Sequence, residues 1–147
     1  AGALAAAAAD TWGTEVGTAL GGTPRLVRGW RPVPPGTSGA VTAAGSLATV
    51  AGAVVTGALA VAFGLGWAAG VAAVVGGIVG AGADTLAGAV AQERRWCDAC
   101  GEATEQRVDA RCGRPTRVRG GLAGLGNDGV NALCTAAGAA AGALCAL

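Results

Sequence analysis

Acidic side chains are rare in this chain, and one of them lies inside a long apolar segment. Residues 68–90, AAGVAAVVGGIVGAGADTLAGAV, have the length of a membrane span and contain one charged residue, Asp84. A carboxylate in hydrocarbon costs roughly 2.5 kcal/mol or more, so it is retained where polar partners satisfy it and marks a functional site by default. We therefore expect Asp84 to meet other polar groups.

Two more acidic residues follow the N-terminal alanine run. On a helix Asp10, Thr14 and Glu15 share one face, where they would present two carboxylates and a hydroxyl together. A similar polar set opens the last apolar segment, with members one turn apart: Asn127, Asp128 and Asn131. Carboxylate and carbonyl oxygens are ligands that suit magnesium. The alternative is an ordinary helix end entering water, where acidic residues are common.

Arginine is the only basic residue type, and all ten arginines fall in two polar segments. The first segment, residues 18–40, is a predicted loop rich in Gly and Pro, and it holds Arg25, Arg28 and Arg31. Free backbone N–H groups and guanidinium groups both suit phosphate oxygens, so this loop is a candidate phosphate-binding element. Alternatively, its arginines anchor the loop at lipid headgroups. A P-loop is excluded because the chain contains no lysine.

The second polar segment, residues 92–121, is rich in both arginine and cysteine. Its cysteines have a spacing that resembles half of a zinc ribbon: Cys97, Cys100 and Cys112. A closed structural zinc site needs four ligands, and the chain has no histidine, so Asp98, Asp109 or another chain would have to complete it. We expect a reduced, metal-free loop with Zn²⁺ an unlikely cofactor, because disulfides are rare on the reducing side of a membrane.

The composition predicts a membrane protein. The chain is 52% apolar and only 13% charged, whereas a soluble surface carries about a quarter charged residues. Residues 41–63 and 68–90 are long enough to span a bilayer, and the short turn between them makes them antiparallel. A third apolar segment runs from residue 122 or 127 to the end. We predict an all-α, polytopic transmembrane bundle of about four helices; a soluble Ala-rich helical protein is the alternative. A net charge of +1 gives no reason to expect nucleic acid as a partner.

The order of spans and loops predicts where the polar groups meet. Two spans separate the arginine-containing segments, so all ten arginines lie on one side, which the positive-inside rule makes cytoplasmic or stromal. Four acidic residues at helix ends should lie near the same side: Asp10, Glu15, Asp84 and Asp128. Carboxylates that hold magnesium, with arginines that neutralise phosphate, are what phosphoryl transfer requires. A packed polar interface without chemistry is the alternative.

Six motifs occur in an order that resembles a known family. They are DTWGTEVG at 10–17, TPR at 23–25, VPPGTSGAVT at 33–42, DTLAGA at 84–89, CDACG at 97–101 and NDGVN at 127–131. The chain resembles the integral-membrane family called domain of unknown function ninety-two, or transmembrane protein 19, whose plant members include the phytyl-phosphate kinase of tocopherol biosynthesis. This chain departs from the family pattern at Gly13-Thr14, where the family has Ala-Ser, at Thr85, where it has Ser, and at Arg111, where it often has His.

This resemblance implies a membrane-embedded phosphotransferase with Mg²⁺ as cofactor. It would transfer a phosphate from a nucleoside triphosphate to a prenyl monophosphate such as phytyl phosphate. Residues 1–147 would form the C-terminal part of one integral membrane domain, in the plastid envelope if the source is a plant or alga. The implied catalytic acids are Asp10, Glu15, Asp84 and Asp128. Three of them would bind magnesium: Asp10, Asp84 and Asp128. The implied phosphate-binding residues are Arg25, Arg28, Arg31, Asn127 and Asn131. The alternatives are a small-molecule or ion transporter or channel, whose intramembrane acids line a path, and a structural bundle without catalysis.

Overall fold

A computed structural model describes residues 1–104 and 106–146, and it contains four helices in this part of the chain. They are α1 (Gly2–Leu20), α2 (Ala43–Ala62), α3 (Gly66–Val90) and α4 (Asn127–Cys145). Helices therefore form over the apolar segments in which they were expected. One boundary differs from the expectation, because α1 continues to Leu20 and the first polar loop begins only after it.

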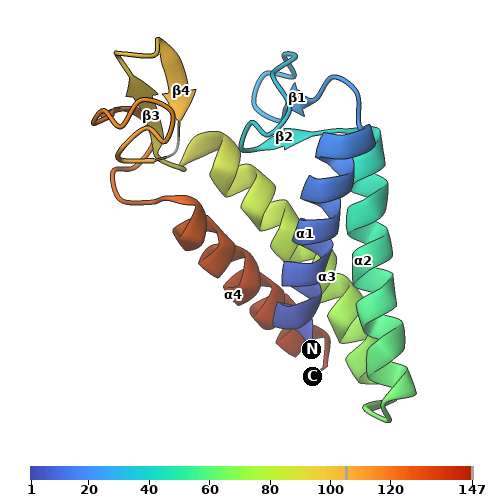
Figure 1. Ribbon diagram of the computed structural model, residues 1–147. Coiled ribbons are helices and arrows are strands. Elements are labelled where there is room, and N and C mark those ends of the chain that lie inside the picture. The colour runs from blue at the N-terminus through green and yellow to red at the C-terminus, as the bar shows by residue number, and fades with distance from the viewer. Residues whose placement is uncertain (105, 147) are drawn as a thin grey trace.

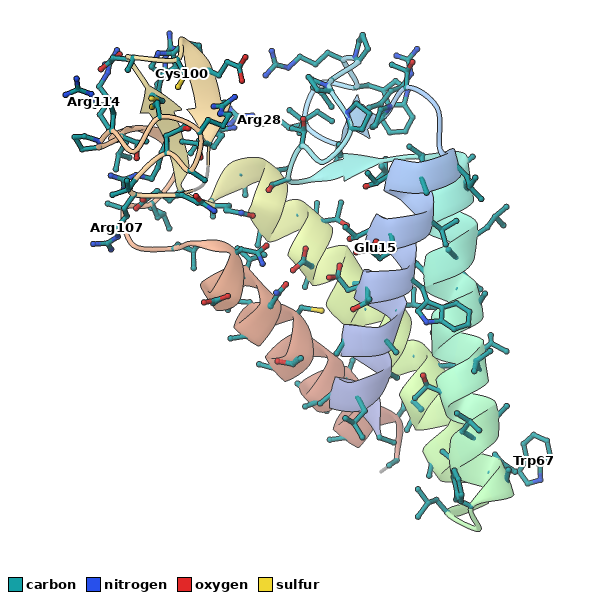
Figure 2. All side chains as sticks on the ribbon, in the orientation of Figure 1. Glu15, Arg28, Trp67, Cys100, Arg107 and Arg114 are labelled. Carbon is teal, nitrogen blue, oxygen red and sulfur yellow. The ribbon has the colours of Figure 1, made fainter. Side chains whose placement is uncertain are left out.

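The two polar segments lie at the same end of the helices. Figure 1 shows the connection from α1 to α2 and the connection from α3 to α4 at one end, which we call the loop end, and the α2–α3 turn and both termini at the other. Figure 2 places Arg28, Arg107 and Arg114 at the loop end, and Trp67 at the opposite end. α1 and α3 are the central helices, since each packs against all three of the others.

Small residues form the core of the bundle, and large apolar residues point away from it. Ala9, Ala53 and Ala81 make up the buried cluster. By contrast, Phe63 is 81% exposed and Leu47 is 73% exposed. Exposed apolar surface of this extent is typical of a lipid-facing protein. α2 and α3 are long and apolar enough to cross a membrane; that α1 and α4 also span it stays a prediction.

Glycines allow the helix backbones to approach closely. A methyl group added at Gly57 of α2 would lie only 2.7 Å from the backbone oxygen of Gly70 in α3. One added at Gly76 of α3 would lie 2.5 Å from the backbone oxygen of Gly138 in α4. The four-residue glycine spacing therefore has the predicted packing role at these positions. Gly66 differs, since it has open space around it and a φ of +84° in the α2–α3 turn.

Short strands organise both loops, which the sequence did not indicate. β1 (Arg25–Leu26) and β2 (Ala40–Val41) form an antiparallel pair in the first loop. The second loop contains a three-stranded sheet in the order β4-β3-β5, and its strands are β3 (Arg94–Cys97), β4 (Glu102–Thr104) and β5 (Arg117–Gly120). Strands of two to four residues are too short to show the alternation of polar and apolar residues by which strands are recognised in a sequence.

Gly39 fixes the first loop against the end of α3. Its φ is +74°, and a side chain there would collide with the backbone of Ala89. Gly88 is the neighbouring point of contact, since a methyl group added to it would lie 3.0 Å from the backbone nitrogen of Gly39. Two glycines thus allow the loop to rest directly on the helix.

We expect Gly39→Ala to destabilise the protein by more than Gly36→Ala does. Both positions have positive φ, which costs an alanine on the order of 1–3 kcal/mol, but nothing lies within 4 Å of an added methyl group at Gly36. The difference in thermal unfolding between the two variants in detergent measures the cost of separating the loop from α3. Equal destabilisation would mean that this contact does not hold the loop.

Glu93 joins the end of α3 to the segment that leads into α4. Its side chain is buried and accepts hydrogen bonds from the backbone N–H of Gly124 and from Arg95. Arg95 also donates to the backbone oxygen of Thr116 at 2.9 Å. The Gly124 hydrogen bond, followed by the Arg95 guanidinium, holds the pKa of Glu93 below its ordinary value of 4.5.

Acid is therefore expected to open this junction. The pKa of Glu93 is lower in the folded state than in the unfolded state, where it is about 4.5. The ionised Glu93 carboxylate therefore stabilises the junction fully above pH 4.5, and this stabilisation is lost as the pH falls through the pKa of the folded state. Hydrogen exchange at the Gly124 amide, corrected for its intrinsic rate, should lose protection over that range. Glu93→Gln should remove this pH dependence, whereas Glu102→Gln, at an exposed ion pair, should preserve it. Unchanged pH dependence in Glu93→Gln would contradict the assignment.

Candidate functional site

A cavity of about 700 Å³ opens at the loop end of the bundle. Residues from α1, α2, α3, the first loop and the start of α4 line it. Figure 2 shows Glu15, one of these residues, on the half of α1 nearest the loops. The cavity therefore lies where the acidic residues and the polar loops were predicted to meet.

A pair of carboxyl groups forms the most polar part of the cavity. Asp10 of α1 and Asp84 of α3 both line it, and their side chains are close enough to interact electrostatically. The Oδ1 atom of Asp84 is buried and has no hydrogen-bond partner among the described residues. Two carboxylates this close repel each other unless a proton or a cation lies between them. The pair is thus suited to hold a small cation.

Hydroxyl groups also line the cavity, and most of them were missed by the sequence reasoning. They line the cavity from three helices: Thr11, Thr14 and Thr18 of α1, Ser46 and Thr49 of α2, and Thr85 of α3. Thr49 donates to the backbone oxygen of Gly45 at 3.1 Å, and Thr85 donates to that of Ala81 at 3.0 Å. The helical spacing of Thr14 and Thr18 from Asp10 was the available signal, since residues four apart share a helix face.

Part of the cavity wall is apolar. Val50 of α2, with Ile78 and Leu86 of α3, lines it, and these side chains are 45%, 42% and 55% exposed. They belong to the outward-facing apolar surface of the bundle. The cavity therefore offers polar groups and also hydrocarbon side chains from α2 and α3.

The structure brings together five of the nine residues predicted for catalysis and phosphate binding. The five that line the cavity are Asp10, Glu15, Asp84, Asn127 and Asn131. Asp128 is exposed and does not line it, although it lies in the same first turn of α4.

The three arginines predicted for phosphate binding are exposed and lie outside the cavity wall. Arg25 donates a hydrogen bond to the backbone oxygen of Trp30 at 2.9 Å, within the first loop. Arg28 and Arg31 belong to the same loop, whose Gly36 and Thr37 do line the cavity. This loop therefore contributes its backbone turn, and not its guanidinium groups, to the cavity.

The donor set of the cavity fits magnesium among metal ions. Carboxylate, hydroxyl and amide oxygens line it, and the buried, unpartnered Asp84 Oδ1 lies among them. Magnesium is a hard cation that binds through one or two carboxylates and retains several waters, for which a cavity of this volume has room. Asp10 and Asp84 are the residues that would hold it.

The predicted cysteine cluster lies apart from this cavity, in the second loop. Cys97, Cys100 and Cys112 are close together, and the sulfur atoms of Cys97 and Cys112 are 3.5 Å apart. Figure 2 shows Cys100 in the sheet-containing loop at the loop end. The loop therefore has a second group of potential metal ligands.

Comparison with known proteins places the chain in a family. It is 31% identical to Protein PGR from Arabidopsis thaliana over 134 residues, which cover 83% of this chain and 45% of that protein. The chain thus spans less than half the length of this relative. No solved structure matches the chain. Residues 1–139 match the family described as Integral membrane protein DUF92. The resemblance carried by the six sequence motifs is confirmed, and the chain belongs to the Integral membrane protein DUF92 family.

Proposed function

We propose that this protein is a membrane-embedded kinase that converts a prenyl monophosphate into the prenyl diphosphate. The observation that carries the proposal is the pair Asp10 and Asp84 inside a cavity with both polar and apolar walls. Phosphoryl transfer needs acidic residues that hold magnesium beside the phosphates, and this pair has the required ligands. The family resemblance supports the same reaction.

In the proposed step, an oxygen of the prenyl phosphate attacks the terminal phosphorus of the nucleoside triphosphate. The bond to the bridging oxygen breaks, a nucleoside diphosphate leaves, and a new phosphorus–oxygen bond forms. The attacking phosphate is already ionised at neutral pH, since its second pKa is about 6, so the step needs no general base. Bound magnesium supplies positive charge that offsets the charge of the phosphates.

The cavity residues position the reactants in this proposal. Asp10 and Asp84, which line the cavity, would hold the metal, and the amide groups of Asn127 and Asn131 would donate hydrogen bonds to phosphate oxygens. The backbone turn at Gly36 adds N–H donors from the loop. We retain Arg25, Arg28 and Arg31 as candidate contacts for the outer phosphates of the nucleotide, because they belong to the loop that forms this turn.

The apolar residues that line the cavity are the reason why we propose a lipid phosphate as the substrate. Val50, Ile78 and Leu86 line the cavity from α2 and α3, are partly exposed, and belong to the two helices that are long and apolar enough to cross a membrane. A prenyl chain can lie along these side chains without leaving hydrocarbon. The phosphate at its end would then lie beside the acidic pair.

The test is an assay of the protein, expressed at the full length encoded by its gene, in proteoliposomes. Geranylgeranyl or phytyl monophosphate is supplied with Mg²⁺ and either CTP or ATP, and the diphosphate is measured by mass spectrometry. We expect product that disappears when EDTA replaces magnesium. No product with any nucleotide would contradict the proposal and would favour a transporter, for which flux of the lipid phosphate across the vesicles is the next measurement.

A further inference from the structure

Two turns in the second loop have the same construction. The first is Cys97-x-x-Cys100-Gly101, in which the Gly101 N–H donates to the backbone oxygen of Cys97 at 2.9 Å and the φ of Gly101 is +68°. The second is Asp109-x-x-Cys112-Gly113. Here the Gly113 N–H donates to the backbone oxygen of Asp109 at 2.8 Å, and the φ of Gly113 is +66°. Asp109 therefore occupies in the second turn the place that Cys97 has in the first.

Both turns connect segments that are paired in an antiparallel manner. The first lies between β3 and β4, and the second lies between Val108 and Pro115, which form an antiparallel bridge. Paired hairpins of this kind, each with a ligand-x-x-Cys-Gly turn, are how a zinc ribbon presents four ligands. The sequence suggested one half of such an arrangement, and the structure contains both.

The four potential ligands converge on one point. One donor atom from each of Cys97, Cys100, Asp109 and Cys112 lies within 4.8 Å of the other three. Zinc–sulfur bonds of about 2.3 Å in a tetrahedron place sulfur atoms about 3.8 Å apart. The sulfur atoms of Cys97 and Cys112 are 3.5 Å apart, close to that separation.

The sheet around these residues lacks an apolar core. Among the described residues of 94–120, the buried ones are Cys97, Asp109 and Thr116. Val108 and Val118, which would be natural core residues, are 54% and 42% exposed. A segment of fewer than about 40 residues usually needs a metal, a disulfide or a partner to hold one structure. The described cysteines are free thiols.

We propose that Cys97, Cys100, Asp109 and Cys112 bind a structural zinc ion that stabilises the second loop. Three thiolates favour a soft or borderline metal such as zinc over magnesium, which prefers oxygen ligands. The closed set of four ligands indicates a structural role, since a catalytic zinc keeps an open position. The sequence alone gave no preference between Asp98 and Asp109 as the fourth ligand. The structure selects Asp109, because the Asp98 side chain is 64% exposed and pairs with Arg117.

Arg111 supports Asp109 from outside the ligand set. Its side chain donates to both carboxylate oxygens of Asp109, at 3.1 Å and 2.8 Å, and it also pairs with Glu102. The Oδ1 atom of Asp109 also accepts from the backbone N–H of Arg111 at 2.9 Å, so both of its lone pairs are in use. The Oδ2 atom accepts from the Arg111 side chain and has a second lone pair with which it can coordinate a metal. Three thiolates and a carboxylate carry more negative charge than one divalent cation neutralises, and the guanidinium offsets part of the excess.

The experiment measures zinc in the full chain, purified in detergent with a reducing agent and without a histidine tag. Inductively coupled plasma mass spectrometry should find about one zinc per chain. Cys100→Ser should lower the zinc content at least about tenfold, and Cys145→Ser, at an exposed cysteine near the end of α4, should leave it unchanged. Cobalt in place of zinc should give thiolate charge-transfer absorption in the wild type.

A second variant covers the case in which Cys100→Ser fails to fold. Asp109→Cys completes a four-cysteine set, and its zinc should resist a competing chelator better than that of the wild type does. The proposal is overturned if the wild type contains no zinc, if it contains iron instead, or if Cys145→Ser loses as much zinc as Cys100→Ser. A disulfide between Cys97 and Cys112 that persists in zinc-free protein purified with the reducing agent would also overturn it.

Discussion

Asp84→Asn is expected to reduce diphosphate formation at least roughly a hundredfold, the scale on which loss of one charge-stabilising group slows an enzyme. The carboxylate lies beside Asp10 in the cavity, and its Oδ1 atom has no hydrogen-bond partner among the described residues. An amide retains the shape of the side chain but provides no charge to hold magnesium. The rate of product formation in proteoliposomes, measured at several magnesium concentrations, gives the comparison.

The unfolding temperature of Asp84→Asn shows whether its loss of activity comes from the missing charge or from misfolding. Asp84→Asn removes a like charge beside Asp10, so the variant should unfold at the same temperature as the wild type or at a higher one. Asp98→Asn is the matched control, since this carboxylate is 64% exposed and belongs to the second loop. It should retain wild-type activity. If Asp84→Asn remained fully active, the acidic pair would not be the magnesium site, and the proposed reaction would lose its main support.

Gly138→Ala should separate α4 from the rest of the bundle and destabilise it by about 1–3 kcal/mol or more, the usual cost of overpacking. The added methyl group would lie 2.5 Å from the Cβ of Ala6, 2.8 Å from the backbone oxygen of Gly76 and 2.9 Å from that of Gly2. Backbone atoms of two other helices would have to move, because none of these groups is a flexible side chain. Thermal unfolding in detergent measures the loss.

Gly82→Ala is the control for Gly138→Ala in the same bundle. Nothing described lies within 4 Å of a methyl group added at Gly82, which is an exposed position of α3. The substitution should leave stability unchanged or raise it by roughly 0.5–1 kcal/mol, since alanine forms helix better than glycine does. Similar unfolding temperatures for the two variants would show that close backbone approach does not hold α4 in place.

The sequence was sufficient to predict the helices and the arrangement of the loops. Apolar segments of spanning length become helices in lipid because their backbone groups must be satisfied internally. Two helices between the polar segments then place both segments at one end, whatever the details of packing. The convergence of Asp10 and Asp84 could be predicted for the same reason, since both lie near that end.

The sequence was not sufficient to predict how each helix is rotated about its axis. Glycine contacts such as Gly76 with Gly138 set that rotation, and they depend on all the helices at once. Asp128 therefore lies outside the cavity, although its neighbours Asn127 and Asn131 line it. From the sequence, Asp109 was only one of several candidates for a fourth zinc ligand, because the likeness of its turn to that of Cys97 is recognised only when both turns are seen together.

The hydroxyl groups of the cavity have a consequence for the order in which reactants enter. The hydroxyl groups of Thr49 and Thr85 each donate their only hydrogen to a backbone carbonyl oxygen of their own helix. They can therefore only accept hydrogen bonds from a bound ligand or coordinate a cation. Together with the carboxyl groups of Asp10 and Asp84, they form an electron-rich part of the cavity wall. These groups would repel a metal-free phosphate electrostatically. A phosphate that is already complexed with magnesium would bind, because the cation offsets its negative charge. The nucleotide should therefore enter as its metal salt, and the metal-free nucleotide should compete poorly.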